Sequence, residues 1–267
     1  MTASVLASAP ATRTTLLGAS MGLMKRGLQR ILRLPSAFFP ALMMPIFQSI
    51  AFSGTFFAIT KIPGFPTDRS INWFMPLGAC MGSAFSGVGL GFALIGDIET
   101  GFFDRLRMAP APRNALLLGP LLTAWFRTML VVTAVLIVGF ILGARLTGGV
   151  LGLIVLYVAG LGIATMATGW GLGLAFRFRD MRGAAVMQLG LFVAIFLSSA
   201  QTPLNVMQGW LHGVARVNPV TNILRLSRQG FVGDLTWSGS WGGLVAIALM
   251  GALALVFARR GLDGLDK

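Results

Sequence analysis

The densest group of charged side chains lies in a short polar stretch, residues 97–113, with the sequence DIETGFFDRLRMAPAPR. It separates two runs that are otherwise almost entirely apolar. Its acids, Asp97, Glu99 and Asp104, come from a chain with only eight Asp and Glu in all. Acids interspersed with arginines are the side chains that form ion pairs with opposite charges on a second protein. The stretch therefore predicts a contact surface for a partner.

The same stretch has the pattern of a short amphipathic helix. If residues 97–108 are helical, Ile98, Phe102 and Leu106 recur at four-residue spacing and share one face. Pro110 then ends the helix, because proline lacks the backbone donor and clashes with the preceding turn. The charged residues occupy the other sides of the helix: Asp97, Glu99, Asp104, Arg105 and Arg107. The pattern predicts a helix that lies on a membrane surface with its charges available.

Motifs for other kinds of chemistry are absent from the sequence. There is no GxxxxGK[ST] phosphate loop, so we expect no nucleotide to bind by that route. His212 has no cysteine or acid cluster around it in sequence, which argues against a metal site. The single cysteine, Cys80, lies in an apolar run and is expected to be a packing residue. No acid maps to the middle of an apolar run, whereas ion-coupled carriers usually keep one there.

Composition places the chain in a membrane. It is 55% hydrophobic and 11% charged, with a mean hydropathy of +0.81, and these values do not suit a soluble domain. The net charge of +13 would suit nucleic acid. However, the basic residues sit in short connections between apolar runs, as topology determinants do. We therefore expect a lipid bilayer, and no nucleic acid, as a partner.

The sequence predicts an all-α integral membrane protein with six transmembrane helices in one domain, residues 37–258. Each candidate span is near the ~20 apolar residues that cross a bilayer. Most of the 21 lysines and arginines fall on the side of the amino terminus, so the positive-inside rule places both termini and residues 97–113 in the cytoplasm. The spans cover about residues 37–59, 73–96, 115–143, 150–176, 183–200 and 240–258.

Both ends of the chain are predicted to be cytoplasmic. Residues 1–15 are rich in Ala, Ser and Thr and predict a disordered tail, and residues 259–267 predict a second tail. Between residues 16 and 34, apolar residues recur at steps of four and three while basic residues fall on the other side. This pattern predicts an amphipathic interfacial helix that Pro35 ends. It fits an anchor or an element that transmits motion, and amphipathicity alone does not separate the two.

Two further features concern the spans and their outer connection. Arg127 lies inside the third run and is expected either to snorkel to the inner headgroups or to be a buried charge on a path through the membrane.

Residues 201–239 hold two apolar helical patches joined at Asn218-Pro219, a dipeptide that favours a turn before a helix. They predict an extracellular re-entrant helical hairpin against the outer leaflet before the last span. Its marker residues are Pro203, Trp210, Asn218 and Pro219.

The pattern as a whole resembles a known family. Six spans, an amphipathic amino-terminal helix, an Asn-Pro hairpin and an Asp-x-Glu-x-Gly-x-x-x-Arg-Leu-x-x-x-Pro loop after the second span resemble the type-2 ABC exporter permeases. The segment DIETGFFDRLRMAPAPRNALLLG is similar to the daunorubicin-resistance-type branch. The resemblance covers roughly residues 20–258, and the loop is its specific part.

The resemblance implies that residues 97–108 form a coupling helix in a groove of a separate ATP-binding subunit. ATP and magnesium would bind to that subunit and no cofactor to this chain. Glu99, Gly101 and Pro110 match the family's recurrent residues, whereas Phe102 stands where many relatives have threonine. A second permease copy, identical or related, is implied as well. The expected contact residues are Asp97, Glu99, Gly101, Phe102, Phe103, Arg105, Leu106, Arg107 and Pro110.

The resemblance also implies a function, an ATP-driven export of a hydrophobic or amphipathic cargo, drug-like or lipid-like, across a bacterial cell membrane. Export of a glycolipid or polysaccharide by the same family, and a passive channel or scramblase, remain open alternatives. A second inner loop fits either a lesser contact with the ATPase or a topology signal alone. Its residues are Arg177, Arg179, Asp180 and Arg182.

Overall fold

The computed structural model describes residues 14–33, 35–233 and 235–266. Their secondary structure is helical, with no strand among them, which confirms the all-α prediction. The predicted amino-terminal tail lies outside the described residues except for residues 14 and 15. The helices are α1 (Leu16–Arg33), α2 (Pro35–Thr55), η1 (Phe57–Lys61), α3 (Ser70–Glu99), α4 (Phe102–Met108), α5 (Ala115–Ile141), α6 (Gly149–Phe178), α7 (Arg182–Phe196), α8 (Gly209–Val217), α9 (Pro219–Val232), α10 (Trp237–Asp263) and η2 (Gly264–Asp266).

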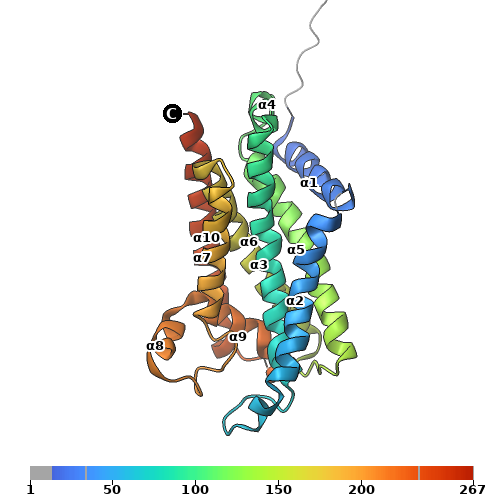
Figure 1. Ribbon diagram of the computed structural model, residues 1–267, viewed down its shortest axis with the longest axis vertical. Helices are drawn as coiled ribbons and strands as arrows, with labels where there is room; N and C mark the ends of the chain where they lie inside the picture. The colour runs from blue at the N-terminus through green and yellow to red at the C-terminus, as the bar shows by residue number, and fades with distance from the viewer. Residues whose placement is uncertain (1–13, 34, 234, 267) are drawn as a thin grey trace, which may run out of the picture.

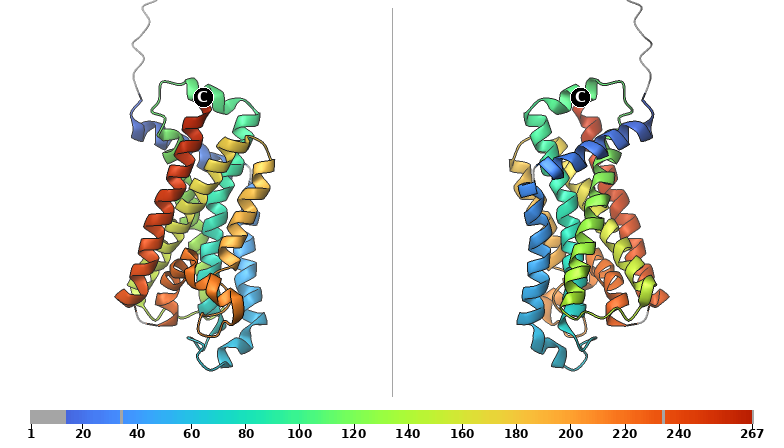
Figure 2. Two further views of the ribbon diagram at one scale, coloured as in Figure 1. Left: turned by 90° about the vertical axis from the view of Figure 1, so that its left-hand side faces the viewer. Right: turned by 90° about the vertical axis from the view of Figure 1, so that its right-hand side faces the viewer.

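The long helices run side by side and give the molecule two distinct ends (Figure 1). One end carries α4 and the end of the described chain, and we call it the α4 end. The opposite end carries α8, α9 and η1, and we call it the α9 end. Figure 2 shows that α1 crosses the bundle near the α4 end instead of running along it. This arrangement places the predicted interfacial helix and the polar stretch at the same end.

Five of the described helices are long and apolar enough to cross a membrane, namely α2, α3, α5, α6 and α10. The expected sixth span, residues 183–200, is shorter than predicted. Its helix, α7, has 15 residues and is about 22 Å long, less than the roughly 30 Å of a bilayer core. It ends at Phe196 because the chain turns there towards α8 and α9. The last span is longer than predicted, since α10 continues through residues 259–263.

Helix α1 covers 18 residues of the predicted interfacial helix, 16–34, and it packs on the bundle as well as facing outward. A Cβ added at Gly27 would lie 2.7 Å from the Thr123 side chain of α5, and one added at Gly119 would lie 2.5 Å from Leu23. These small residues let the two helices approach closely. Met21 is 54% exposed on another side. The predicted interfacial helix is thus also fixed against α5.

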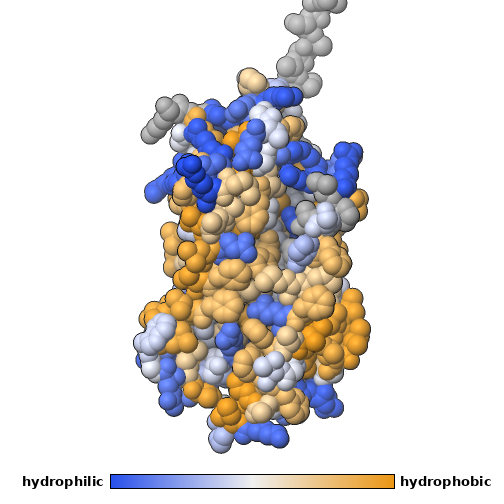
Figure 3. All heavy atoms as spheres, viewed as in Figure 1, coloured by the Kyte–Doolittle hydropathy of each residue, from blue (hydrophilic) through white to orange (hydrophobic). Residues whose placement is uncertain are grey.

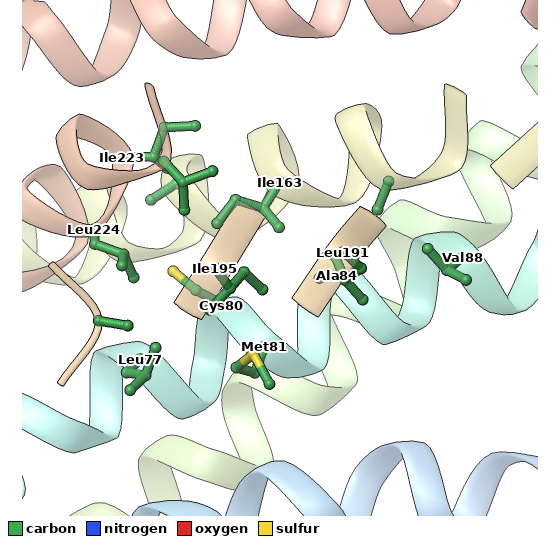
Figure 4. Close-up of a cluster of buried hydrophobic side chains, with 14 of the residues drawn as sticks. Leu77, Cys80, Met81, Ala84, Val88, Ile163, Leu191, Ile195, Ile223 and Leu224 are labelled. Carbon is green, nitrogen blue, oxygen red and sulfur yellow. The ribbon is translucent and has the colours of Figure 1, made fainter. Parts of the chain in front are cut away.

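The main core lies between α3, α6, α7 and α9 (Figure 4). Cys80 is buried in it, as expected for a packing residue. Helix α9 is buried along most of its length, which corrects the expectation of a hairpin lying against the outer leaflet. A Cβ at Gly230 would lie 2.4 Å from the backbone of Gly152, so α9 and α6 meet at their backbones. The residues labelled in Figure 4 are Leu77, Cys80, Met81, Ala84, Val88, Ile163, Leu191, Ile195, Ile223 and Leu224.

The surface agrees with a membrane location. In the view of Figure 3, hydrophobic residues predominate along the middle of the molecule, and hydrophilic ones gather at the α4 end. Large apolar side chains such as Ile141, Leu151 and Leu253 are more than half exposed on the long helices. In water such a surface would be unfavourable, whereas lipid chains cover it without cost. The chain is therefore built as a multi-pass membrane protein.

Candidate functional site

The polar stretch folds as two helices with a sharp turn between them, so the prediction of one helix over residues 97–108 is wrong. Helix α3 ends at Glu99, and α4 begins at Phe102. Gly101 has a φ of 68°, a left-handed conformation that glycine adopts without steric cost. The amide of Thr100 and its hydroxyl both donate to the carbonyl of Gly96 and close the last turn of α3. The turn lets α4 leave the direction of α3.

Phe103 holds α4 against the helix bundle. Its side chain is 3% exposed and belongs to a buried cluster with Leu117, Phe176 and Leu262, from α5, α6 and α10. The rings of Phe103 and Phe176 are 5.6 Å apart. We expected Phe103 to face a partner, but its side chain faces its own chain. The sequence pattern missed this because the turn at Gly101 rotates α4 relative to a continuous helix.

The outward side of α4 is polar apart from one methionine. Met108 is 78% exposed, and the Asp104 side chain is 70% exposed. Arg105 is exposed as well. Arg107 donates to the carbonyl of Leu265 at 3.3 Å and lies 4.0 Å from Asp104. Two further predicted contact residues, Glu99 and Pro110, are also exposed, and Phe102 and Leu106 are half-buried.

Asp97 is paired within the chain. Its two carboxylate oxygens accept hydrogen bonds from the Arg26 guanidinium, each at 2.7 Å, and Arg30 lies 3.6 Å away. The bonds to Asp97 raise the pKa of the Arg26 guanidinium, which also lies 3.9 Å from the centre of the Phe102 ring. The Asp97 side chain is only 17% exposed. It therefore ties α1 to α3 at the base of α4.

The second inner loop, 177–182, contacts α10 and forms hydrogen bonds within itself. The Arg177 guanidinium lies 4.0 Å from the centre of the Phe257 ring of α10. Arg179 ends α6 with a φ of 58°. Asp180 accepts a hydrogen bond from the backbone amide of Arg182 at 2.8 Å, and their side chains are 3.7 Å apart. These contacts define the turn between α6 and α7, and Arg182 extends from it with a side chain that is 89% exposed.

At the α9 end, Asn218 joins two helices. Its Oδ1 accepts from the amide of Val220 at 2.9 Å and caps α9, with Pro219 in the first turn as predicted. Its Nδ2 donates to the carbonyls of Ala194 and Leu197 at the end of α7. Carbonyls at a helix end have no partner within the helix, and inside a membrane no water reaches them. Asn218 therefore lets α7 end below full membrane length.

Arg228 donates to further carbonyls beyond the end of α7, and the sequence did not identify it as a functional residue. It is 3% exposed and donates to the carbonyls of Ser199 at 2.7 Å, Trp73 at 3.2 Å, and Ala200. Its guanidinium lies 3.6 Å from the centre of the Trp73 ring. The contact could not be read from the sequence, since Arg228 looks like any basic residue in a connection. Its donors satisfy three buried carbonyls from two other parts of the chain.

The two remaining marker residues of the hairpin, Pro203 and Trp210, differ in burial. Pro203 is buried, whereas Trp210 in α8 is 74% exposed. An exposed tryptophan at the end of a membrane helix bundle suits the boundary between lipid headgroups and hydrocarbon. The hairpin thus has a buried arm, α9, and an exposed arm, α8.

Five membrane-length helices among the described residues, with the short helix α4 exposed at one end, define the class of a multi-pass membrane protein. The chain matches the family model described as "ABC-2 type transporter" over residues 20–232, and it belongs to this family. It is therefore a permease, the non-catalytic transmembrane part of an ABC transporter. Permeases of this family pair with ATP-binding subunits, which confirms the class that the resemblance implied.

Two relatives extend the comparison. The chain is 24% identical over 253 residues to the "Daunorubicin resistance ABC transporter permease protein DrrB1" of Streptomyces coeruleorubidus, covering 92% of this chain and 85% of that protein. It is 27% identical over 218 residues to the "Putative transport permease ycf38" of Pyropia yezoensis, covering 77% of this chain and 71% of that protein.

Proposed function

We propose that this chain is the membrane-spanning subunit of an ATP-driven exporter, and that α4 couples it to a separate ATP-binding subunit. The observation that carries the proposal is the two-sided character of α4. Phe103 fastens the helix to α5, α6 and α10, while Asp104, Arg105 and Met108 point away from the bundle. A helix that is fixed on one side and exposed on the other can pass movement of a bound partner to the spans.

The same contacts give a route for that movement. A displacement of α4 reaches the ends of three long helices through the buried Phe103 cluster. It reaches α1 through the contact of Phe102 with the Arg26 guanidinium, and α3 through the bonds of Arg26 to Asp97. The exposed charges contribute little binding energy individually, about 0–1 kcal/mol each. Met108 therefore supplies the apolar part of the contact, and Arg105 sets its electrostatic specificity.

The arrangement in the membrane follows from the same proposal. The α4 end faces the cytoplasm with both termini, and the α9 end faces outward, in a bacterial cell membrane. Helix α7 acts as a sixth, shortened span, because α8 and α9 take up the outer part of its path. A second permease copy, identical or related, completes the translocation path. The drug-resistance name of one relative supports a hydrophobic or amphipathic cargo, drug-like or lipid-like.

Co-purification from native membranes tests the coupling. We would compare the unaltered chain with the double variant Arg105→Glu and Met108→Ser at equal expression. The expected result is that an ATPase with a Walker phosphate loop accompanies the unaltered chain and is lost from the variant. The matched control is Arg216→Glu with Val217→Ser, two exposed neighbours on α8 at the other end, which should retain the ATPase.

Two different results would contradict the proposed coupling. An ATPase that binds equally to the unaltered chain and the α4 variant would mean that another surface couples the subunits. If no ATPase accompanies any form, the exporter assignment fails, and a passive channel or scramblase takes its place. Transport by the purified chain alone, without ATP, would support that replacement directly.

A further inference from the structure

A cavity opens between α1, α2, α3 and α5 at the α4 end, with a volume of about 450 Å³. Three arginines line it, Arg26 and Arg30 from α1 and Arg127 from α5. The rest of its wall is largely apolar and includes Phe38 and Phe85. This volume falls within the roughly 300–1,000 Å³ of pockets that bind small molecules. Cationic groups beside an apolar wall suit a ligand with a charged head and a hydrophobic body.

Arg127 lacks the partners that a charge inside a membrane domain requires. Its side chain is half-buried near the middle of α5, and its Nε atom is buried with no hydrogen-bond partner among the described residues. The guanidinium lies 5.0 Å from the centre of the Phe38 ring. A Cβ added at Gly89 would lie 3.7 Å from its Nη1, so the glycine leaves the space beside it open. The buried Nε fits the predicted buried charge better than a snorkelling arginine, which would expose its head to the headgroup region.

The negative charge in the cavity is smaller than the positive charge of its arginines. Asp97 is the one acid that lines it among the described residues, and Arg26 occupies both of its carboxylate oxygens. Arg30 lies 3.6 Å from one oxygen and donates to the carbonyl of Ala93 at 3.4 Å. The side of the cavity that Arg30 and Arg127 line therefore keeps an excess of positive charge.

We infer that this cavity binds an anionic amphiphile, with a phosphate or carboxylate headgroup against Arg30 and Arg127 and an apolar body against Phe38 and Phe85. An unpaired charge away from water is costly, and an oxyanion with matching geometry removes that cost. Guanidinium groups bind phosphate and carboxylate through paired hydrogen bonds. A cationic headgroup would be repelled by the same two arginines. Binding of such a ligand does not depend on the proposed function. Only the further step, that the ligand is a cargo of the exporter, rests on it.

Binding can be measured on the purified chain in phosphatidylcholine nanodiscs without any ATPase. The probe is a fluorescent long-chain alkyl phosphate, and the matched contrast is the same fluorophore and chain with a trimethylammonium head. We expect the phosphate to bind at least about tenfold more tightly than the ammonium, as charge-assisted hydrogen bonds predict. Equal affinity for both heads would overturn the inference. Because no nucleotide or ATPase is present, this failure is separate from failure of the coupling.

Two variants locate the site. Arg127→Gln removes the charge and should weaken binding of the alkyl phosphate about tenfold or more. Gly89→Leu keeps every charge and fills the space beside Arg127, so it should weaken binding too. Arg216→Gln, an exposed arginine at the α9 end, should bind as the unaltered chain does. Unchanged affinity in both cavity variants, with the chain folded by circular dichroism, would overturn the assignment.

A competition step identifies the source of the ligand. Phosphatidylglycerol is added to the nanodiscs while the alkyl phosphate is bound. If phosphatidylglycerol displaces the alkyl phosphate from the unaltered chain but not from Arg127→Gln, the site is upheld and a leaflet phospholipid can fill it. Retention of the probe upholds the site for a free single-chain amphiphile and excludes the resident phospholipid.

Discussion

Arg228 and Arg127 are two arginines within the membrane domain, and their surroundings are opposite. Arg228, in the hairpin at the α9 end, donates to three backbone carbonyls and stacks on Trp73. Arg127, at the cavity of the α4 end, has a buried Nε with no partner among the described residues. A charge whose donors are all used within the chain stabilises the fold. A charge that the chain leaves unsatisfied is available to a ligand.

The same contrast holds for the two ends as a whole. At the α9 end, Asn218 and Arg228 satisfy the carbonyls where α7 stops. At the α4 end, Asp104, Arg105 and Met108 face outward. The surroundings of α9 thus resemble a closed protein interior, whereas the outward face of α4 resembles one side of an interface. Substitutions should separate the two ends, with large effects on stability at the first and large effects on binding at the second.

The largest expected effect on stability is that of Arg228→Met. It removes the donors of three buried carbonyls, each of which then costs about 1–3 kcal/mol. We predict that the free energy of unfolding falls by about 3 kcal/mol or more, measured by titration with SDS in mixed micelles. The control is Arg225→Met on the same helix, where the side chain is exposed. An equal loss in both variants would show that the bonds of Arg228 do not hold this end.

Phe103→Ala should have the next largest effect. It leaves a cavity among Leu117, Phe176 and Leu262 and should cost about 3 kcal/mol. We expect the loss to be local, so that limited proteolysis cuts the chain at residues 100–113 much faster. Phe102→Ala is the matched variant, because Phe102 is half-buried and should change cleavage little. Equal cleavage rates in the two variants would contradict the anchoring role of Phe103.

The ion pair of Arg26 and Asp97 should contribute less. Its bond distances are short, but the Arg26 side chain is 42% exposed, so solvent screening limits the pair to about 1 kcal/mol. A double-mutant cycle with alanine at both positions measures this coupling energy. Hydrogen exchange of the α1 amides should rise in both single variants. The exposed pair Asp180 and Arg182, 3.7 Å apart, should couple by less than about 0.3 kcal/mol.

The smallest expected effect on stability is that of Arg105→Glu. The side chain is exposed on α4, so the free energy of unfolding should stay within about 0.5 kcal/mol of its original value. Chemical unfolding under the conditions used for Arg228→Met gives the comparison. A loss as large as that of Phe103→Ala would mean that Arg105 holds the fold, and the outward face of α4 would then need another definition.

Much of the fold could be predicted from the sequence, because long apolar runs and charge placement are local properties. The bounds of α1 and the turn at Asn218-Pro219 agree closely with the structure. The length of α7 could not be predicted, since its early end depends on donors from Asn218 and Arg228. Those contacts form only when α9 folds back into the bundle.

The candidate site was predicted in position but not in orientation. The stretch 97–113 is at one end of the molecule, and Glu99, Asp104 and Arg105 are exposed there, as its composition indicated. The turn at Gly101 was read as a position within one helix, so Phe103 was assigned to the wrong side. The pairing of Asp97 with Arg26 joins positions 71 residues apart, and no local pattern signals such a contact.

The central claim is that the outward face of α4, and not the equally exposed α8, contacts the ATP-binding subunit. Met108 and Val217 provide a matched pair, since they are 78% and 80% exposed at opposite ends. The most direct measurement places a photo-crosslinking amino acid at one position or the other in cells and identifies the products by mass spectrometry. We predict that a Walker-type ATPase is crosslinked at position 108 and not at position 217. The reverse pattern, or no ATPase at either position, would contradict the account.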